Sequence, residues 1–175
     1  MTQLIIEDGS VVADANSYVT DAEYVSYASL RGKTMPSTAA EREAQLVMAY
    51  DYLTFTYESR LQGERTKADQ TGFMPRRYMY AFNESVLDNV IPSQFKKAQM
   101  MAALSINDGV DTNATKTDPD LASFTVVGVY AETYQSGKST PVLASMPAVS
   151  RVLQPYTKNG STGGGTYRQN MGFLG

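Results

Sequence analysis

Hydrophobic residues recur at helical spacing in four stretches of the chain. In the longest stretch, Leu46, Ala49, Tyr50 and Leu53 fall at i, i+3, i+4 and i+7, which predicts a helix over about 38–57 with this face buried. Similar spacing predicts three more helices, over about 21–31, 92–107 and 147–156. The buried faces expected for these three are Ala22, Tyr24, Val25 and Ala28; Phe95, Ala98, Ala102 and Ile106; and Val149, Val152, Leu153 and Tyr156.

Helix-end signals support the first two of these helices. Thr20 with Glu23, and Thr38 with Glu41, have the spacing of a capping box, in which each side chain satisfies a free backbone N–H of the first turn. Gly32 follows the first helix where a left-handed cap is expected. Both helices therefore have well-defined starting points.

Other stretches lack helical spacing. We expect 57–89 to be a long loop packed by its own aromatic residues, because Gly72 and Pro75 disfavour regular structure there. Within 124–134, Val, Thr and aromatic residues on either side of Gly128 predict a small β pair.

The composition changes after Tyr156. The run from Lys158 to Gly165 is typical of a flexible linker, and 157–175 is predicted to be a Gly-rich linker with a docking tail. The expected organisation is one helical domain over 1–156 followed by this tail. The predicted fold class is mainly α, a four-helix bundle with a small β pair before the last helix and an extended C-terminal tail.

Charge and composition exclude several functions. The chain has no His and no Cys, which removes Ser-His-Asp triads, Cys nucleophiles, disulfides and the usual zinc sites. We therefore expect no enzyme activity, no cofactor and no metal. The net charge of −3 argues against a dedicated nucleic-acid binder and is compatible with a conduit that DNA passes without adhering. We expect no membrane span and no signal peptide, and folding in a reducing cytoplasm.

Two short motifs are weak. Gly137-Lys138-Ser139 lacks the first glycine of a phosphate-binding loop, and a surface loop is the favoured interpretation. The acidic pairs Asp108/Asp111 and Asp118/Asp120 lack the closing Glu of a calcium loop, and solvated loop charge is favoured for them.

Basic and aromatic residues interleave in one place, within 73–82. Such a pattern can stack single-stranded bases, or it can form a contact between subunits. Because the patch is short and the chain is acidic, the interface is favoured. The interface candidates are Phe73, Arg76, Arg77, Tyr78, Tyr80 and Phe82.

The C-terminal tail has aromatic and apolar anchors but too few to form a core. Such a segment can order on a partner, although functionless termini are common. The residues expected to dock are Tyr167, Arg168, Gln169, Asn170, Met171, Phe173 and Leu174.

The N-terminal residues also carry a resemblance. The sequence I-x-E-D-G over 5–9, then D-A-N-S-Y-V over 14–19, then a helix ending at Arg31-Gly32, resembles the opening of a tailed-bacteriophage family. Its members are head–tail adaptor (head-completion) proteins, and many carry the label DnaT-like ssDNA-binding protein. Relatives also have a "G-x-R … Q … W-P-R" passage. Here Gly63-Glu64-Arg65, Gln70 and Phe73-Met74-Pro75-Arg76 are similar to it, with Phe73-Met74 where the aromatic residue usually stands.

The resemblance implies a connector-type bundle and a structural role in the virion neck. Copies would form a closed ring of about twelve beneath the portal protein, extend the DNA channel, and provide the platform for the tail or the next neck protein. The tail would latch onto the portal, genomic double-stranded DNA would pass through the lumen without specific binding, and assembly would take place in the host cytoplasm. The alternative is a single-stranded-DNA-binding accessory protein of phage replication, as the family label suggests.

Overall fold

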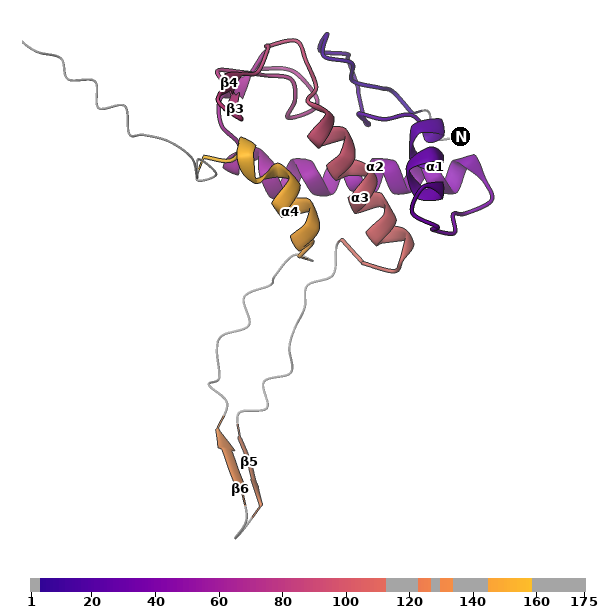
Figure 1. Cartoon of the computed structure of the whole chain (residues 1–175), viewed down its shortest axis with the longest axis vertical. Coiled ribbons are helices and arrows are strands. Elements are labelled where there is room, and N and C mark those ends of the chain that lie inside the picture. The colour runs from indigo at the N-terminus through magenta and orange to yellow at the C-terminus, as the bar shows by residue number, and fades with distance from the viewer. Residues whose placement is uncertain (1–3, 113–122, 127–129, 134–144, 159–175) are drawn as a thin grey trace, which may run out of the picture.

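The computed structural model describes residues 4–112, 123–126, 130–133 and 145–158 (Figure 1). In chain order, the elements are α1 (Asp21–Ser29), α2 (Ala39–Tyr57), η1 (Glu58–Arg60), β1 (Glu64–Arg65), β2 (Arg76–Arg77), β3 (Tyr80–Ala81), β4 (Glu84–Ser85), α3 (Ser93–Asn107), β5 (Ser123–Val126), β6 (Tyr130–Thr133), α4 (Pro147–Leu153) and η2 (Gln154–Tyr156), where η marks a 3-10 helix.

The expected helix starts are confirmed. Thr20 and Glu23 form a complete capping box, and Gly32 has φ of +62° after α1. At α2 the box is half complete. The Thr38 hydroxyl accepts from the Glu41 N–H, but the Glu41 carboxylate accepts from that same hydroxyl and not from the backbone. One N–H at the start of α2 therefore lacks the expected partner from Glu41.

The expected buried face of α1 is partly wrong. The structure buries Tyr24 and Ala28, whereas Ala22 is exposed and the Val25 side chain is 38% exposed. Tyr24 is fully buried, and its hydroxyl donates to the Gln45 amide oxygen on α2 (3.0 Å). The helix is oriented so that this large aromatic side chain, rather than Val25, is removed from water.

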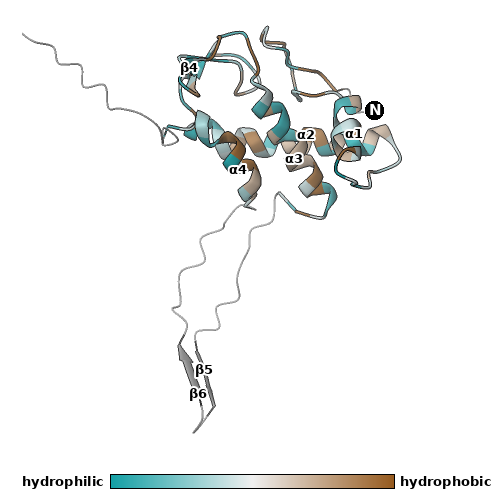
Figure 2. Cartoon of the chain, viewed as in Figure 1, coloured by the Kyte–Doolittle hydropathy of each residue, from teal (hydrophilic) through white to brown (hydrophobic). Residues whose placement is uncertain are grey.

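The core forms where α3 packs against both α2, which precedes it in the chain, and α4, which follows it (Figure 1). The predicted face of α2, with Leu46, Ala49, Tyr50 and Leu53, is buried as expected. Figure 2 shows both hydrophobic and hydrophilic stretches on α3 and α4, and the buried residues of these helices include Phe95, Ala98 and Ala102 on α3 and Val149 and Leu153 on α4. The alternation predicted from helical spacing is therefore present in the folded chain.

The four-helix bundle is a wrong prediction, because the fold is mixed in content. Segment 57–89, expected to be a loop, folds into η1 and two antiparallel strand pairs, β1–β2 and β3–β4. This segment supplies Phe73, Met74 and Met79 to the core, all of them buried. Part of the core therefore comes from a segment with no helical period, and the helices do not close a bundle by themselves.

The third strand pair coincides with the expected β pair over 124–134, except that it begins one residue earlier, at Ser123. β5 and β6 are antiparallel, and Ser123 pairs with Thr133 and Val126 with Tyr130. The docking-tail residues from 159 onward lie outside the described residues.

A buried glutamine joins three parts of the core. The Gln99 side chain on α3 is fully buried. Its amide oxygen accepts from the Tyr18 N–H (2.8 Å), and its amide nitrogen donates to the Ser17 hydroxyl and to the Leu46 carbonyl (both 2.9 Å). These bonds fix α3 to α2 and to the segment that precedes α1, and they satisfy polar groups that water cannot reach.

Gln99→Leu should destabilise the protein by about 2–4 kcal/mol, because it leaves the Tyr18 N–H buried without its partner and removes the side-chain bonds to Ser17 and to the Leu46 carbonyl. Urea unfolding followed by circular dichroism measures this change. Lys97→Leu, at an exposed position on the same helix, is the matched control and should change stability by less than about 0.5 kcal/mol. Equal effects of the two substitutions would contradict the role assigned to Gln99.

Three aromatic rings pack beside this glutamine bond network. The rings of Tyr18 and Tyr50 have centroids 4.9 Å apart, and Phe73 meets Tyr18 edge-on at 5.6 Å. Gly72 makes room for them, since a Cβ atom there would lie 2.0 Å from the Tyr50 hydroxyl oxygen. Burial raises the pKa of Tyr50 to about 12 and also raises the pKa of Tyr18.

This pKa shift predicts a loss of stability in alkali. A phenol with a higher pKa in the folded state keeps its proton there longer, so stability is full below the ordinary value of 10.0 and falls as the pH rises toward about 12. Tyr50→Phe should make the fall shallower, whereas Tyr78→Phe, whose ring is exposed, should leave it unchanged. Urea unfolding at a series of alkaline pH values measures the slope, and identical slopes for the two variants would refute the assignment.

Candidate functional site: an exposed aromatic hairpin

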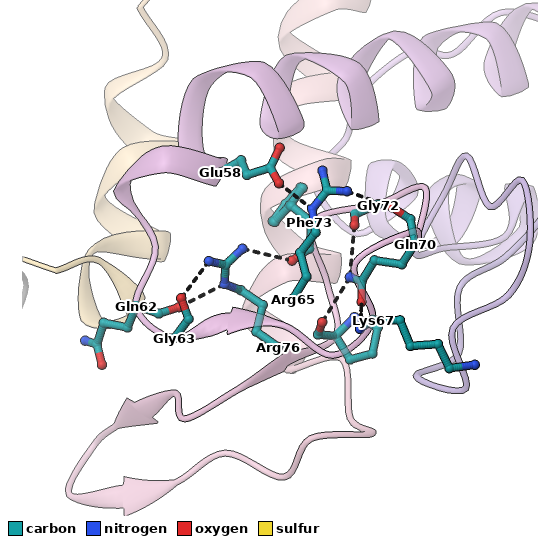
Figure 3. Close-up of polar contacts among 10 residues, drawn as sticks. Glu58, Gln62, Gly63, Arg65, Lys67, Gln70, Gly72, Phe73 and Arg76 are labelled. Carbon is teal, nitrogen blue, oxygen red and sulfur yellow. Dashed lines mark hydrogen bonds and ion pairs between the residues drawn. The ribbon is translucent and has the colours of Figure 1, made fainter.

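The candidate site stands on a polar anchor built around Arg76, whose residue surface is 6% exposed. The guanidinium donates to the carbonyls of Gln62 and Gly63 (both 2.8 Å) and more weakly to that of Phe73 (3.4 Å) (Figure 3). Burial lowers the pKa of Arg76 below its ordinary value. The side chain therefore ties the start of β1 to the start of β2.

Gln70 provides the second tie in the anchor (Figure 3). Its amide nitrogen donates to the carbonyls of Gly72 (2.9 Å) and Pro75 (3.0 Å), and its amide oxygen accepts from the Lys67 N–H (3.0 Å). Arg65 donates to the Gln70 carbonyl (2.8 Å) and forms an ion pair with Glu58. That pairing raises the pKa of Arg65.

The residues of the "G-x-R … Q … P-R" passage are thus brought together in one network. The long polar side chains of Arg65, Gln70 and Arg76 bond to backbone groups within the segment or to Glu58. These bonds serve the fold of the segment itself. The passage is a structural element that holds the segment between α2 and α3 in one shape.

The anchor presents a tight hairpin. Tyr80 pairs with Ser85, and Ala81 pairs with Glu84. The two turn residues, Phe82 and Asn83, have φ of 53° and 65°, as in the type I′ turn that suits the twist of a two-residue hairpin.

Glycine and asparagine usually occupy such turn positions. A left-handed backbone costs an ordinary residue about 1–2 kcal/mol. Tyr78, at φ 60°, and Phe82 both carry this cost. The fold therefore retains two bulky aromatic residues where small residues would be more stable.

Large apolar side chains cover the outside of the hairpin and the segment after it. We call this set the aromatic hairpin surface; its exposed members are Tyr78, Tyr80, Phe82, Leu87 and Val90. Tyr78 is 75% exposed and Phe82 is 64% exposed, although Phe82 also meets Tyr156 edge-on with centroids 5.9 Å apart. Several large exposed apolar side chains on one short stretch of chain are a feature of interaction sites.

The charges around this surface are balanced or negative. Arg77 lies 5.8 Å from the centre of the Tyr78 ring, but its guanidinium pairs with Glu64 (3.2 Å). Glu84 and Asp88 are exposed on the same stretch. A phosphate backbone approaching the surface would therefore meet carboxylates as well as one paired cation.

The predicted interface residues divide into two groups. Phe73 and Arg76 are buried, so their side chains hold the fold and are not available to another subunit. Arg77 is half-buried, whereas Tyr78, Tyr80 and Phe82 are exposed.

Sequence reasoning missed Leu87 and Val90. These two apolar residues lie beside an acidic residue in a stretch with no helical or strand periodicity, so the sequence pattern did not indicate that they belong to an exposed surface. The predicted docking residues of the tail lie outside the described part of the chain.

No three His, Cys, Asp or Glu side chains within 4–112, 123–126, 130–133 and 145–158 cluster closely enough to hold a metal ion. Over these same residues, no helix combines the length and apolar character that crossing a membrane requires.

These features define a small domain of mixed helix and strand content that displays a rigid aromatic surface. Residues 2–170 match the family model described as "Putative DnaT-like ssDNA binding protein", so the chain belongs to that family. No curated protein matches the chain, and no solved structure does. The family expected from the N-terminal motifs is confirmed, and the head–tail adaptor assignment stays a prediction.

Arg76→Gln should cost about 2–3 kcal/mol of stability, because hydrogen bonds from a buried charged donor to the Gln62 and Gly63 carbonyls are lost. Arg77→Gln is the neighbouring control and should cost less than about 1 kcal/mol, since its ion pair with Glu64 is solvent-exposed. Urea unfolding measures both changes. Hydrogen exchange at the Val86 N–H, which bonds to the Met79 carbonyl, reports whether the hairpin loosens; unaltered exchange in Arg76→Gln would rule out the anchor.

Proposed function

We propose that this protein is a head-to-tail adaptor, a structural subunit of the virion neck that docks on other proteins through the aromatic hairpin surface. One observation carries the proposal: Tyr78 and Phe82 are exposed although their left-handed backbone is costly. Strain of this kind persists where the surrounding structure enforces it, and it concentrates at functional sites.

The chemistry of the surface favours a protein as the partner. Tyrosine and phenylalanine supply large contact areas with few rotatable bonds, and tyrosine is among the residues that dominate binding energy at protein interfaces. The nearest cation, Arg77, is already paired with Glu64. The surface can therefore bury apolar area against a protein without leaving Arg77 as an unpaired cation, and its exposed carboxylates, Glu84 and Asp88, call for basic or hydrogen-bonding groups on the partner.

The partners follow from the resemblance to adaptor proteins. They are further copies of this chain in a closed ring, the portal protein, and the tail or the next neck protein, with genomic DNA passing through the lumen. A ring uses two different patches on each subunit. The aromatic hairpin surface is suited to be one of these patches, and the tail predicted to latch onto the portal would add affinity through its many copies.

Single-stranded DNA binding is the second candidate, and the family description favours it over the adaptor function. Exposed aromatic rings can stack unpaired bases, at about 1–3 kcal/mol for each base. Tyr78, Tyr80 and Phe82 provide such rings. Against this function stand the net charge of −3 and the carboxylates Glu84 and Asp88 beside the rings.

A double substitution separates the two functions. Tyr78→Ser with Phe82→Ser should weaken docking on purified portal at least tenfold, since it removes two exposed aromatic anchors. The only ring contact with the core that it removes is the edge-on contact of Phe82 with Tyr156 among the described residues, and circular dichroism of the variant checks that the fold is kept. Phe55→Ser, at an exposed aromatic residue on α2 outside this surface, is the matched control and should retain docking. Co-sedimentation measures the affinity, and electron microscopy should place the protein as an axial ring at the narrow end of the portal.

Anisotropy of a labelled single-stranded oligonucleotide over a salt series tests the second candidate on the same variants. Weak binding that disappears at moderate salt is expected for an adaptor. Tight, saturable binding that is lost in the double variant, with no portal ring, would overturn the proposal in favour of single-stranded DNA binding.

A further inference from the structure

A cavity of about 430 Å³ opens between the end of α2 with η1 and the segment α4–η2. Its lining includes two cationic side chains, Arg60 and Lys158, and the hydroxyls of Ser59 and Ser150, and no carboxylate is among the residues that line it. A volume of this size lies within the range of small-molecule pockets. The chain as a whole is acidic, with a net charge of −3, whereas the lining of this cavity is positively charged.

Backbone pairing holds the two cations together. Leu61 and Thr157 form an isolated antiparallel bridge, and the Lys158 N–H donates to the Arg60 carbonyl (2.9 Å). In an antiparallel pair, the residues on either side of a bridge also face each other across the strands. Arg60 and Lys158 are therefore opposite one another, and both line the cavity.

Two like charges directly opposite each other destabilise an antiparallel pair. The nearest acidic residue along the chain, Glu58, is engaged by Arg65. The Arg60 guanidinium makes no hydrogen bond or ion pair within the part of the chain that the structure describes. The Lys158 ammonium donates to the Ser59 carbonyl (2.9 Å), which leaves two of its three N–H groups for a ligand.

We propose that this cavity binds a phosphate oxyanion between Arg60 and Lys158. The guanidinium supplies a planar fork that matches two phosphate oxygens, and the ammonium neutralises the remaining charge. Ser59 and Ser150 line the same space. The Ser150 hydroxyl is bonded to the Tyr57 hydroxyl (2.6 Å), and the Ser59 hydroxyl can donate a further bond. The site goes beyond the docking function and depends on neither candidate function, because the phosphate can belong to a free small molecule or to a nucleic-acid backbone.

Titration of the full chain with sodium phosphate, followed by ¹H–¹⁵N NMR, tests the site directly. Saturable shifts are expected at the amides of Arg60 and Lys158, beyond those caused by sodium chloride at equal ionic strength. Arg60→Gln with Lys158→Gln should weaken the apparent phosphate affinity at least tenfold. Lys67→Gln with Lys97→Gln removes the same charge from exposed positions elsewhere and should leave the affinity unchanged.

A single-stranded dT oligonucleotide in the same assay distinguishes the two sources of phosphate. If it binds, and the salt slope falls by about one for each cation removed at the site, the backbone of nucleic acid is the ligand class. If phosphate binds and the oligonucleotide does not, the ligand is a free phosphate-bearing molecule; both results support the site.

Two results overturn the proposal. One is a phosphate response at Arg60 and Lys158 no larger than that of chloride, and the other is an equal loss of affinity in the two double variants. Because the wild-type titration maps the site without any substitution, it decides the matter even if the Arg60/Lys158 variant folds poorly.

Discussion

The buried side-chain amide of Gln99 connects α3 to α2 and to the segment before α1. The position of the candidate site depends on this connection. The amide bonds to Tyr18, Ser17 and Leu46, which belong to the segment before α1 and to α2. Apolar packing alone is non-directional and would allow α3 to slide or rotate against its neighbours. A buried amide that satisfies three specific polar groups permits one arrangement, because any other leaves donors and acceptors unpaired.

The packing of α3 against its neighbours also sets the position of the candidate site. Phe95, one turn before Gln99 on α3, packs on Phe73 with ring centroids 5.8 Å apart. Phe73 in turn belongs to the segment that Arg76 and Gln70 tie together through backbone carbonyls. The hairpin therefore depends on the anchored segment, and the anchored segment depends on the helix core through Phe73 and Phe95.

The sequence predicted those parts of the molecule whose cause is local. Helix positions, the Thr20–Glu23 cap and the buried face of α2 follow from spacing and short-range bonding, and the structure has them. The four-helix bundle was wrong because the order of 57–89 comes from side chains bonding to distant carbonyls, which leaves no period to detect. For the same reason, Arg76 was predicted on a surface and lies inside, whereas the exposed position of Tyr78 matches the expectation for an interface residue.

At the turn formed by Phe82 and Asn83, the residue that would be most stable differs from the residue that would bind a partner best. A glycine at position 82 would relieve the left-handed backbone but would delete the ring that is offered to a partner. Selection for thermal stability alone would therefore favour the replacement of Phe82. The resulting protein would be more stable but would lack one aromatic side chain of its binding surface. Screens for improved versions of this protein need an assembly readout beside the melting curve.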